Sequence, residues 1–372
     1  MFNKPRLWCV VALFMAIASG FAACSKKQPN EIKIGAILPL TGEGAKYGTS
    51  AKNGIELAIS EINAAGGIHG KPLSAVYEDD QADPKVGVAA FQKLAMAKVL
   101  GVIGALPSSV TLALAPIAEK AKIALISPMS SNPKISDAGD FIFRNCISDL
   151  YEGSEMGKYA FQKLSLKKIA ILYINNDYGI GLKDVFKHEF EALGGVVVQA
   201  ESFDQAAADF RTQIAKIKSS NPDAIYLVGY NEMIQVFKQL KELRVGCQVL
   251  STIMLNDPGL LAKMGDTAEG AILTAWTYDP KDAKNALFVG KFKEKYNTEP
   301  DVFAAQSYDT AKIFALAIEK GGESTVEVKN ALYQIKDYPG VTGTTTFDEK
   351  GDVVKPLKFL KIHQGKFLDA AK

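Results

Sequence analysis

Apolar runs rich in β-branched residues alternate with helical runs along most of this chain, and this alternation restricts the folds that it can adopt. Ile32–Leu38 and Leu73–Tyr77 have the character of strands. Between them, Ile55, Ala58 and Ile62 recur at helical spacing. Strands that alternate with helices of this length predict an α/β fold, with parallel sheets covered by helices on both faces.

The same pattern continues to the end of the chain. It predicts further strands at Val99–Gly104, Ile123–Ser127, Lys168–Ile174, Val196–Glu201, Ala224–Gly229, Gln248–Ile253 and Ala271–Trp276. It predicts further helices near Val86–Ala97, Val110–Ala121, Leu182–Leu193 and Ser307–Lys320. The tail, Thr345–Phe367, is expected to form a short hairpin that turns at Glu349-Lys350-Gly351.

One order of features occurs twice. In the first half a strand is followed by Tyr47-Gly48, a helix, Gly66-Gly67 and another strand. In the middle of the chain Tyr178-Gly179 and Gly194-Gly195 stand in the corresponding places. The repeat indicates two lobes of one architecture, each a doubly wound parallel sheet. The length of the chain also exceeds what a single core usually serves.

The first residues have the features of an export signal. Lys4 and Arg6 precede the apolar run Leu7–Phe21, which is short for a membrane span and is followed by two alanines and Cys24. We therefore expect a secretory signal peptide at residues 1–23. Cys24 looks like the lipidated cysteine of a lipobox, with residues 24–30 as a tether, although Phe21 departs from the usual aliphatic residue. Ordinary cleavage to a soluble protein is the alternative, and both place the protein outside the cytoplasm.

The charges and cysteines of the mature chain exclude some functions. The signal holds two of the 43 basic residues and none of the 41 acidic ones, so 41 of each remain. This balance argues against nucleic acid or an anionic membrane surface as a partner. Cys146 and Cys247 remain after processing. They could pair in an oxidising compartment, but lone cysteines are more often small buried apolar residues, and we expect no disulfide.

Catalytic and metal-binding patterns are weak. His69, His188 and His363 have no partner at the spacing of a metal site or a catalytic triad. The glycines of Gly42–Gly48 do not match the dinucleotide-binding spacing and are better explained as turn residues. We therefore expect no enzyme, metal or cofactor.

Small hydroxyl residues and tyrosines gather instead where strands end. Ser108 and Ser109 follow one predicted strand and open a helix, whose free N–H groups and dipole favour a carboxylate, although serines there could simply cap the helix. Tyr47, Tyr178 and Tyr230 each lie just past a strand end. Ligands of open α/β sheets bind at the carboxyl ends of the strands. The pattern predicts an aromatic-walled binding cleft between the two lobes.

Several motifs, in order, make the chain similar to a known family. They are Ile34-Gly-Ala-Ile-Leu-Pro-Leu-Thr-Gly42, Glu61-Ile-Asn-Ala-Ala-Gly-Gly-Ile-His-Gly70, Asp79-Asp80 with Asp83-Pro84, Ala121–Pro128, Asn176-Asp-Tyr-Gly179 and Phe347-Asp-Glu-Lys-Gly-Asp352. Through them residues 31–372 resemble the leucine/isoleucine/valine-binding proteins, the type I periplasmic solute-binding proteins of ABC importers.

The resemblance implies two lobes joined by three crossovers, with the ligand cleft between them. The first lobe would comprise residues 31–147 and 278–340, and the second 148–277 and 341–372. The protein would be a periplasmic monomer that binds a small carboxylate or amino acid by hinge closure and then docks on a membrane permease. It would touch the membrane only through its lipid. A ligand-sensing module of the same fold is the alternative role.

The resemblance also implies roles for particular residues. Ser108 and Ser131 match the positions that hold the ligand carboxylate, and the Met129 carbonyl matches one that accepts from the ligand ammonium. The side chains that would close around the ligand are Tyr47, Tyr178, Tyr230 and Phe303.

This sequence departs from the family pattern at two places. The cysteines of a disulfide found in leucine-binding members are replaced by Ala82 and Pro107. The acidic partner of the ligand ammonium is replaced by Ile253, and the candidates to substitute for it are Asp257 and Asp149. Asp257 precedes a proline and is equally suited to cap a helix.

Two ligand classes therefore stay open. If Asp257 or Asp149 reaches the pocket, we expect an apolar or branched-chain α-amino acid, which family frequency favours. If neither Asp257 nor Asp149 reaches the pocket, an amine-free aliphatic or aromatic carboxylate becomes the better prediction, because a buried ammonium without a carboxylate is costly.

Overall fold

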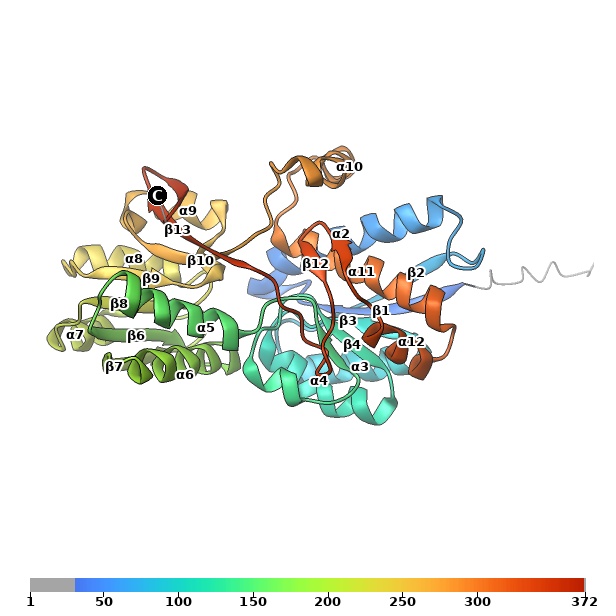
Figure 1. Cartoon of the computed structure of the whole chain (residues 1–372), viewed down its shortest axis with the longest axis horizontal. Helices are drawn as coiled ribbons and strands as arrows, with labels where there is room; N and C mark the ends of the chain where they lie inside the picture. Colours follow the sequence, from blue (N-terminus) through green and yellow to red (C-terminus); the bar gives the residue numbers. More distant parts are fainter. Residues whose placement is uncertain (1–30, 371–372) are drawn as a thin grey trace, which may run out of the picture.

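The computed structural model describes residues 31–370, which form two α/β lobes (Figure 1). The expected signal peptide, residues 1–23, and the expected tether with Cys24 lie outside the described residues. None of the helices in the described part combines the length and the apolar character needed to cross a membrane.

The first lobe is built on a parallel sheet with the strand order β2-β1-β3-β4-β5. Its strands are β1 (Ile32–Leu38), β2 (Leu73–Asp79), β3 (Gly101–Ile103), β4 (Ala124–Ser127) and β5 (Ile142–Arg144). Its helices are α2 (Ala45–Ala64), α3 (Pro84–Met96), α4 (Ser108–Ala121), α10 (Ala286–Tyr296), α11 (Val302–Gly321) and α12 (Thr325–Tyr333).

Alternating side chains of these strands serve opposite faces of the sheet. Ile34 and Ile126 pack in the core beneath α2 and α11. Ile37 and Leu125 pack in the opposite core, beneath α3 and α4. Side chains on successive strand residues point to opposite faces, so a strand buried on both sides must be apolar throughout. This is why these strands are continuous apolar runs in the sequence.

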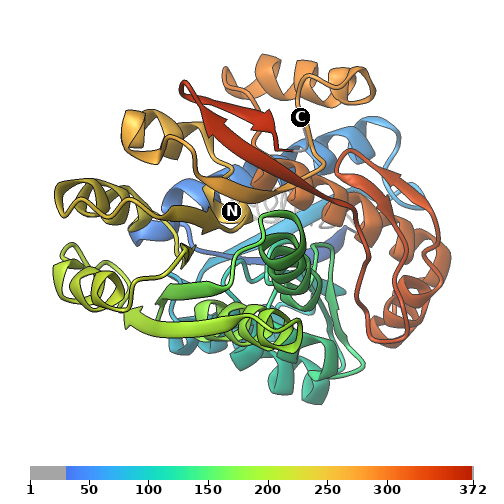
Figure 2. The same cartoon turned by 60° about the vertical axis from the view of Figure 1, so that its left-hand side comes forward.

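The second lobe contains a seven-stranded sheet in the order β14-β13-β10-β9-β8-β6-β7. Its strands are β6 (Lys168–Ile174), β7 (Val196–Phe203), β8 (Ala224–Val228), β9 (Gln248–Ser251), β10 (Ile272–Trp276), β13 (Leu357–His363) and β14 (Lys366–Asp369). Its helices are α5 (Asp149–Lys158), α6 (Asp177–Ala192), α7 (Arg211–Ser219), α8 (Met233–Glu242) and α9 (Pro258–Met264). Figure 2 shows the C-terminal hairpin of β13 and β14 beside β10, with which β13 pairs antiparallel.

The chain passes between the lobes three times, after β5, after β10 and before β13 (Figure 1). Cys146 lies buried in the first passage, whereas Cys247 precedes β9 in the second lobe, and neither is in a disulfide. The expected two lobes with three crossovers are thus the fold of this chain.

The tail differs from the expected hairpin. The strands β11 (Tyr338–Gly340) and β12 (Gly343–Thr345) pair with each other. The hairpin near the C-terminus turns at Gln364-Gly365, not at 349–351 as we expected. The polar residues 348–352 do form a tight turn, with Gly351 N–H donating to the Asp348 carbonyl. That turn packs on the first lobe instead of joining two strands.

Residues 341–353 contact the first lobe, although we expected them in the second. Phe347 packs edge-on against Phe143 of β5, with ring centroids 5.3 Å apart. Arg144, which is fully buried, forms a two-pronged ion pair with Asp352, with Nε–Oδ1 at 2.6 Å and Nη2–Oδ2 at 2.8 Å. Val353 still packs in the core of the first lobe, and the buried Lys355 donates to Gln306 Oε1 of α11. The third passage therefore leaves the first lobe only after Lys355.

We predict that Asp352→Ala lowers the free energy of unfolding by about 3 kcal/mol, because it leaves the buried Arg144 guanidinium without its counter-charge. Lys350→Ala in the same turn removes only an exposed pair with Asp137 and should cost less than about 1 kcal/mol. Urea denaturation of the two variants measures both values. Equal losses would contradict the anchoring role of the buried pair.

Candidate ligand-binding cleft

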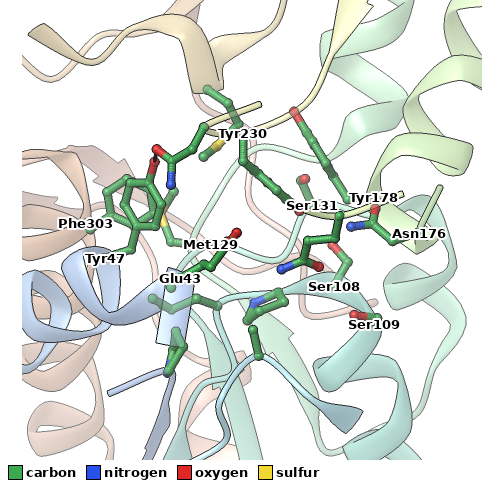
Figure 3. Close-up of a pocket in the computed structure, with 18 of the residues that line it drawn as sticks. Glu43, Tyr47, Ser108, Ser109, Met129, Ser131, Asn176, Tyr178, Tyr230 and Phe303 are labelled. Carbon is green, nitrogen blue, oxygen red and sulfur yellow. Dashed lines mark hydrogen bonds between the residues drawn. The ribbon is translucent and has the colours of Figure 1, made fainter. Parts of the chain in front are cut away.

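A pocket lies between the lobes, at the carboxyl ends of strands from both sheets (Figure 3). It encloses about 920 Å³, including the open solvent at its mouth. Eight of the expected site residues line it: Tyr47, Ser108, Met129, Ser131 and Phe303 from the first lobe, and Tyr178, Tyr230 and Ile253 from the second. The strand-end pattern thus brings together residues that are far apart in the sequence.

The first-lobe wall presents hydrogen-bond donors at the start of α4. Pro107 occupies the N-cap position, where it makes no side-chain cap, so the serines do not cap this helix. Among the described residues no acceptor is bonded to the N–H groups of Ser108 and Ser109. The Ser108 hydroxyl accepts from Asn132 N–H at 3.2 Å, which leaves its own proton free to donate. This arrangement suits a carboxylate.

The loop after β4 presents an acceptor beside these donors. The Ser127 hydroxyl accepts from Met129 N–H at 3.2 Å and donates to the Ala105 carbonyl at 2.6 Å, which fixes the loop. In the described part of the chain no donor reaches the Met129 carbonyl. The carbonyl is available to a donor on a ligand.

Aromatic pairs form walls on both sides. Tyr47 and Phe303 have ring centroids 4.6 Å apart in the first lobe. Tyr178 and Tyr230 stack at 5.3 Å in the second lobe, and the Tyr178 hydroxyl donates to Thr252 Oγ1 at 3.0 Å. Figure 3 shows the two pairs on different sides of the pocket. Such rings give an apolar ligand body large contact surfaces.

The repeated Tyr-Gly pair has a structural cause. A Cβ atom on Gly48 would lie 2.0 Å from the Pro39 carbonyl oxygen, just past the end of β1. A Cβ atom on Gly179 would lie 2.0 Å from the carbonyl oxygen of Ile174, the last residue of β6. Only glycine lets each helix approach the strand end so closely. That approach places the preceding tyrosine in the pocket.

The lobes also contact each other directly. The Tyr47 hydroxyl donates to Asn231 Oδ1 at 3.1 Å, and the Asn132 side-chain amide donates to the Asp177 carbonyl. Lys46 Nζ lies 2.6 Å from Asp257 Oδ2. Each of these contacts joins a residue of the first lobe to one of the second.

Neither of the two candidate acids lines the pocket. Asp257 caps α9 by accepting from Gly259 N–H at 2.6 Å, and its other oxygen pairs with Lys46. Asp149 is fully buried at the start of α5. Burial, and after it the charge of Glu152, raises the pKa of Asp149 well above its ordinary value.

Glu152 lines the pocket and is an acid that the sequence reasoning missed. It lies one helical turn after Asp149 on α5, so a search for acids at helical spacing from Asp149 would have found it. Its Oε1 atom accepts from Ile253 N–H at 2.9 Å and from the Thr274 hydroxyl at 2.5 Å. Burial raises the pKa of Glu152. Trp276, at the end of β10, also lines the pocket and was missed.

Within residues 31–370 no group of three or more His, Cys, Asp and Glu side chains is arranged to hold a metal ion. The pocket instead combines hydrogen-bond donors, acceptors and aromatic rings on two facing lobes. This construction defines a two-lobed solute receptor with the type I periplasmic-binding-protein fold.

Comparisons with known proteins agree with this assignment of the fold and the kind of site. The model of the periplasmic binding protein family matches residues 31–366. A leucine-, isoleucine-, valine-, threonine- and alanine-binding protein of Pseudomonas aeruginosa is 32% identical over 344 residues, covering 92% of each chain. The chain belongs to the periplasmic binding protein family.

Two solved structures are also similar. The branched-chain amino acid transporter substrate-binding protein of Streptococcus pneumoniae, in complex with isoleucine, is 30% identical with a TM-score of 0.83, covering 91% of this chain and 97% of that one. A solute-binding protein of an ABC transporter from Rhodopseudomonas palustris, in complex with 3,4-dihydroxybenzoic acid, is 26% identical with a TM-score of 0.80, covering 91% and 95%.

We predict that Asp149→Asn stabilises the ligand-free protein at pH 7 by about 1 kcal/mol or more, which raises Tm by about 2 to 4 °C. The raised pKa means that the folded state holds a proton on Asp149 that the unfolded state releases. Stability is therefore lost as pH rises from the unfolded value of about 4, and the gain of the variant grows over the same range.

Thermal unfolding between pH 4 and pH 7 measures this gain. Glu155→Gln, which neutralises a partly exposed acid on the same helix, should change Tm little at any pH. A gain for Asp149→Asn that does not depend on pH would contradict the explanation.

Proposed function

We propose that this protein is the extracytoplasmic receptor of an ABC importer, and that it binds a small ligand with a carboxylate and an apolar body. The observation that carries the proposal is the uncapped start of α4 in a pocket walled by aromatic rings. The N–H groups of Ser108 and Ser109 and the Ser108 hydroxyl are donors that the fold itself does not use. Charge-assisted hydrogen bonds to these donors would anchor a carboxylate.

The ligands named for similar proteins support this chemistry. Isoleucine and 3,4-dihydroxybenzoic acid, bound by two structural neighbours, share a carboxylate and differ in the amine. Isoleucine is an α-amino acid and 3,4-dihydroxybenzoic acid is an amine-free carboxylate, the two ligand classes left open by the sequence. In both, the carboxylate would bind at Ser108 and Ser131, with Tyr47, Phe303, Tyr178 and Tyr230 around the body.

Hinge closure is the mechanism that we propose. A ligand held between walls from both lobes adds contacts only when the lobes approach, and so shifts the equilibrium toward the closed form. The closed form would then dock as a monomer on a membrane permease. The expected signal peptide and the lipid on Cys24 would keep the receptor at the outer side of the cytoplasmic membrane or in the periplasm.

We predict that the double variant Ser108→Ala/Ser131→Ala binds its ligand at least about hundredfold more weakly, because it removes two hydrogen bonds to a charged group and each contributes about 1.5 to 3 kcal/mol. Isothermal titration with leucine and with 4-methylpentanoate measures the change. Ser219→Ala, on α7 and outside the pocket lining, serves as the control. Unchanged affinity for both ligands would refute the carboxylate anchor.

A further inference from the structure

Glu152 is the one acid of the second-lobe wall that the fold does not fully satisfy. Glu232 also lines the pocket, but its two oxygens accept from Ala206 N–H and Tyr230 N–H. Both hydrogen bonds to Glu152 end on Oε1, and among the described residues none reaches Oε2. The side chain is only 2% exposed, yet it belongs to the pocket lining. A carboxylate oxygen is therefore held at the pocket wall without a partner from the protein.

The charge of this carboxylate is not neutralised by the fold. No ion pair to Glu152 or Asp149 occurs among the described residues, and neither oxygen of Asp149 has a hydrogen-bond partner of good geometry. Arg144 favours the charged form of Asp149, but its guanidinium already binds Asp352 and the carbonyls of Ser131 and Asn132. A buried carboxylate without a counter-charge is costly, so this wall is complementary to a cation.

The position of the carboxylate is fixed by β9 and β10. The Ile253 N–H, directly after β9, and the Thr274 hydroxyl on β10 both hold Oε1. Glu152, on α5, thus contacts the backbone of Ile253. Ile253 is the position at which the family resemblance implies an acid. Glu152 therefore supplies a carboxylate in the part of the pocket where Ile253 replaces the acid of the family pattern.

The pocket then has two poles of opposite character. The donors of Ser108 and Ser109 form one, and the unpaired acceptors, the Met129 carbonyl and Glu152 Oε2, form the other. A ligand with a carboxylate alone would leave the second pole unpaired. A zwitterion with a carboxylate and an ammonium satisfies both.

We propose that Glu152 binds the ammonium group of the ligand and makes this receptor selective for α-amino acids over amine-free carboxylates. This assignment rests on the proposed function and names the ligand class of the same cleft. Asp149 does not line the pocket and therefore makes no contact with the ligand. Asp257 has no part in ligand recognition, because its oxygens cap α9 and pair with Lys46.

The test compares matched ligands on the exported full-length protein. Isothermal titration is run with leucine, valine, alanine and phenylalanine, and with 4-methylpentanoate, 3-methylbutanoate, propanoate and 3-phenylpropanoate, the same skeletons without the amine. We expect binding of at least one amino acid, with its amine-free partner at least about tenfold weaker. Tighter binding of the amine-free partners would overturn the assignment and leave the proposed function standing. Binding of none of the eight would contradict both.

Two variants locate the selectivity. Glu152→Gln keeps the size and removes the charge, so it should weaken the amino acid at least about tenfold and leave the amine-free partner within about threefold. Asp257→Asn keeps a helix cap and should stay within about fivefold for both. Loss of amino-acid binding in Asp257→Asn but not in Glu152→Gln would overturn the assignment. If Glu152→Gln does not fold, the comparison of amino acids with their amine-free partners on the unmodified protein still tests whether the receptor selects for the amine.

Discussion

The parallel arrangement of the strands is the constraint on which the cleft depends. Because β1, β3 and β4 run in one direction, the loops that follow them meet at one edge of the first sheet, and the same holds for β6, β8 and β9 in the second. The two edges face each other across the pocket. Ser108, Met129, Tyr178 and Tyr230, spread over more than a hundred residues, become neighbours for that reason alone.

The internal repeat extends this constraint to individual side chains. Gly48 and Gly179 let α2 and α6 begin almost in contact with the backbone at the strand ends, so each lobe presents a tyrosine in the equivalent place. The buried Arg144 with Asp352 then ties the third connection to the first sheet. The aromatic walls therefore belong to separate lobes, and in the proposed hinge closure the change of shape would be confined to the three connections.

Local patterns in the sequence predicted the features that local physics determines. The strands at Ile32–Leu38 and Lys168–Ile174 are confirmed at both ends, because strand ends can be read from apolar periodicity. Tyr47, Ser108, Tyr178 and Tyr230 line the pocket at strand ends, whereas Phe303 and Ile253 were expected there from the family resemblance alone. The polar turn at 349–351 was misplaced in a hairpin, since its partner surface lies on β5. Glu152 was missed because its approach to Ile253 depends on how α5 packs against a strand about a hundred residues away.

The direct bonds between the lobes bear on how reliably an importer can tell a loaded receptor from an empty one. Tyr47 with Asn231, Asn132 with Asp177 and Lys46 with Asp257 join protein groups directly across the cleft. In the proposed hinge closure, each contact would favour the approach of the lobes whether or not a ligand is bound, so part of the population would present a closed but empty receptor to the permease. The combined free energy of these contacts would set the fraction of empty receptors that are closed. For a loaded receptor to be distinguished, this free energy must stay below the one that a bound ligand adds to the closed form.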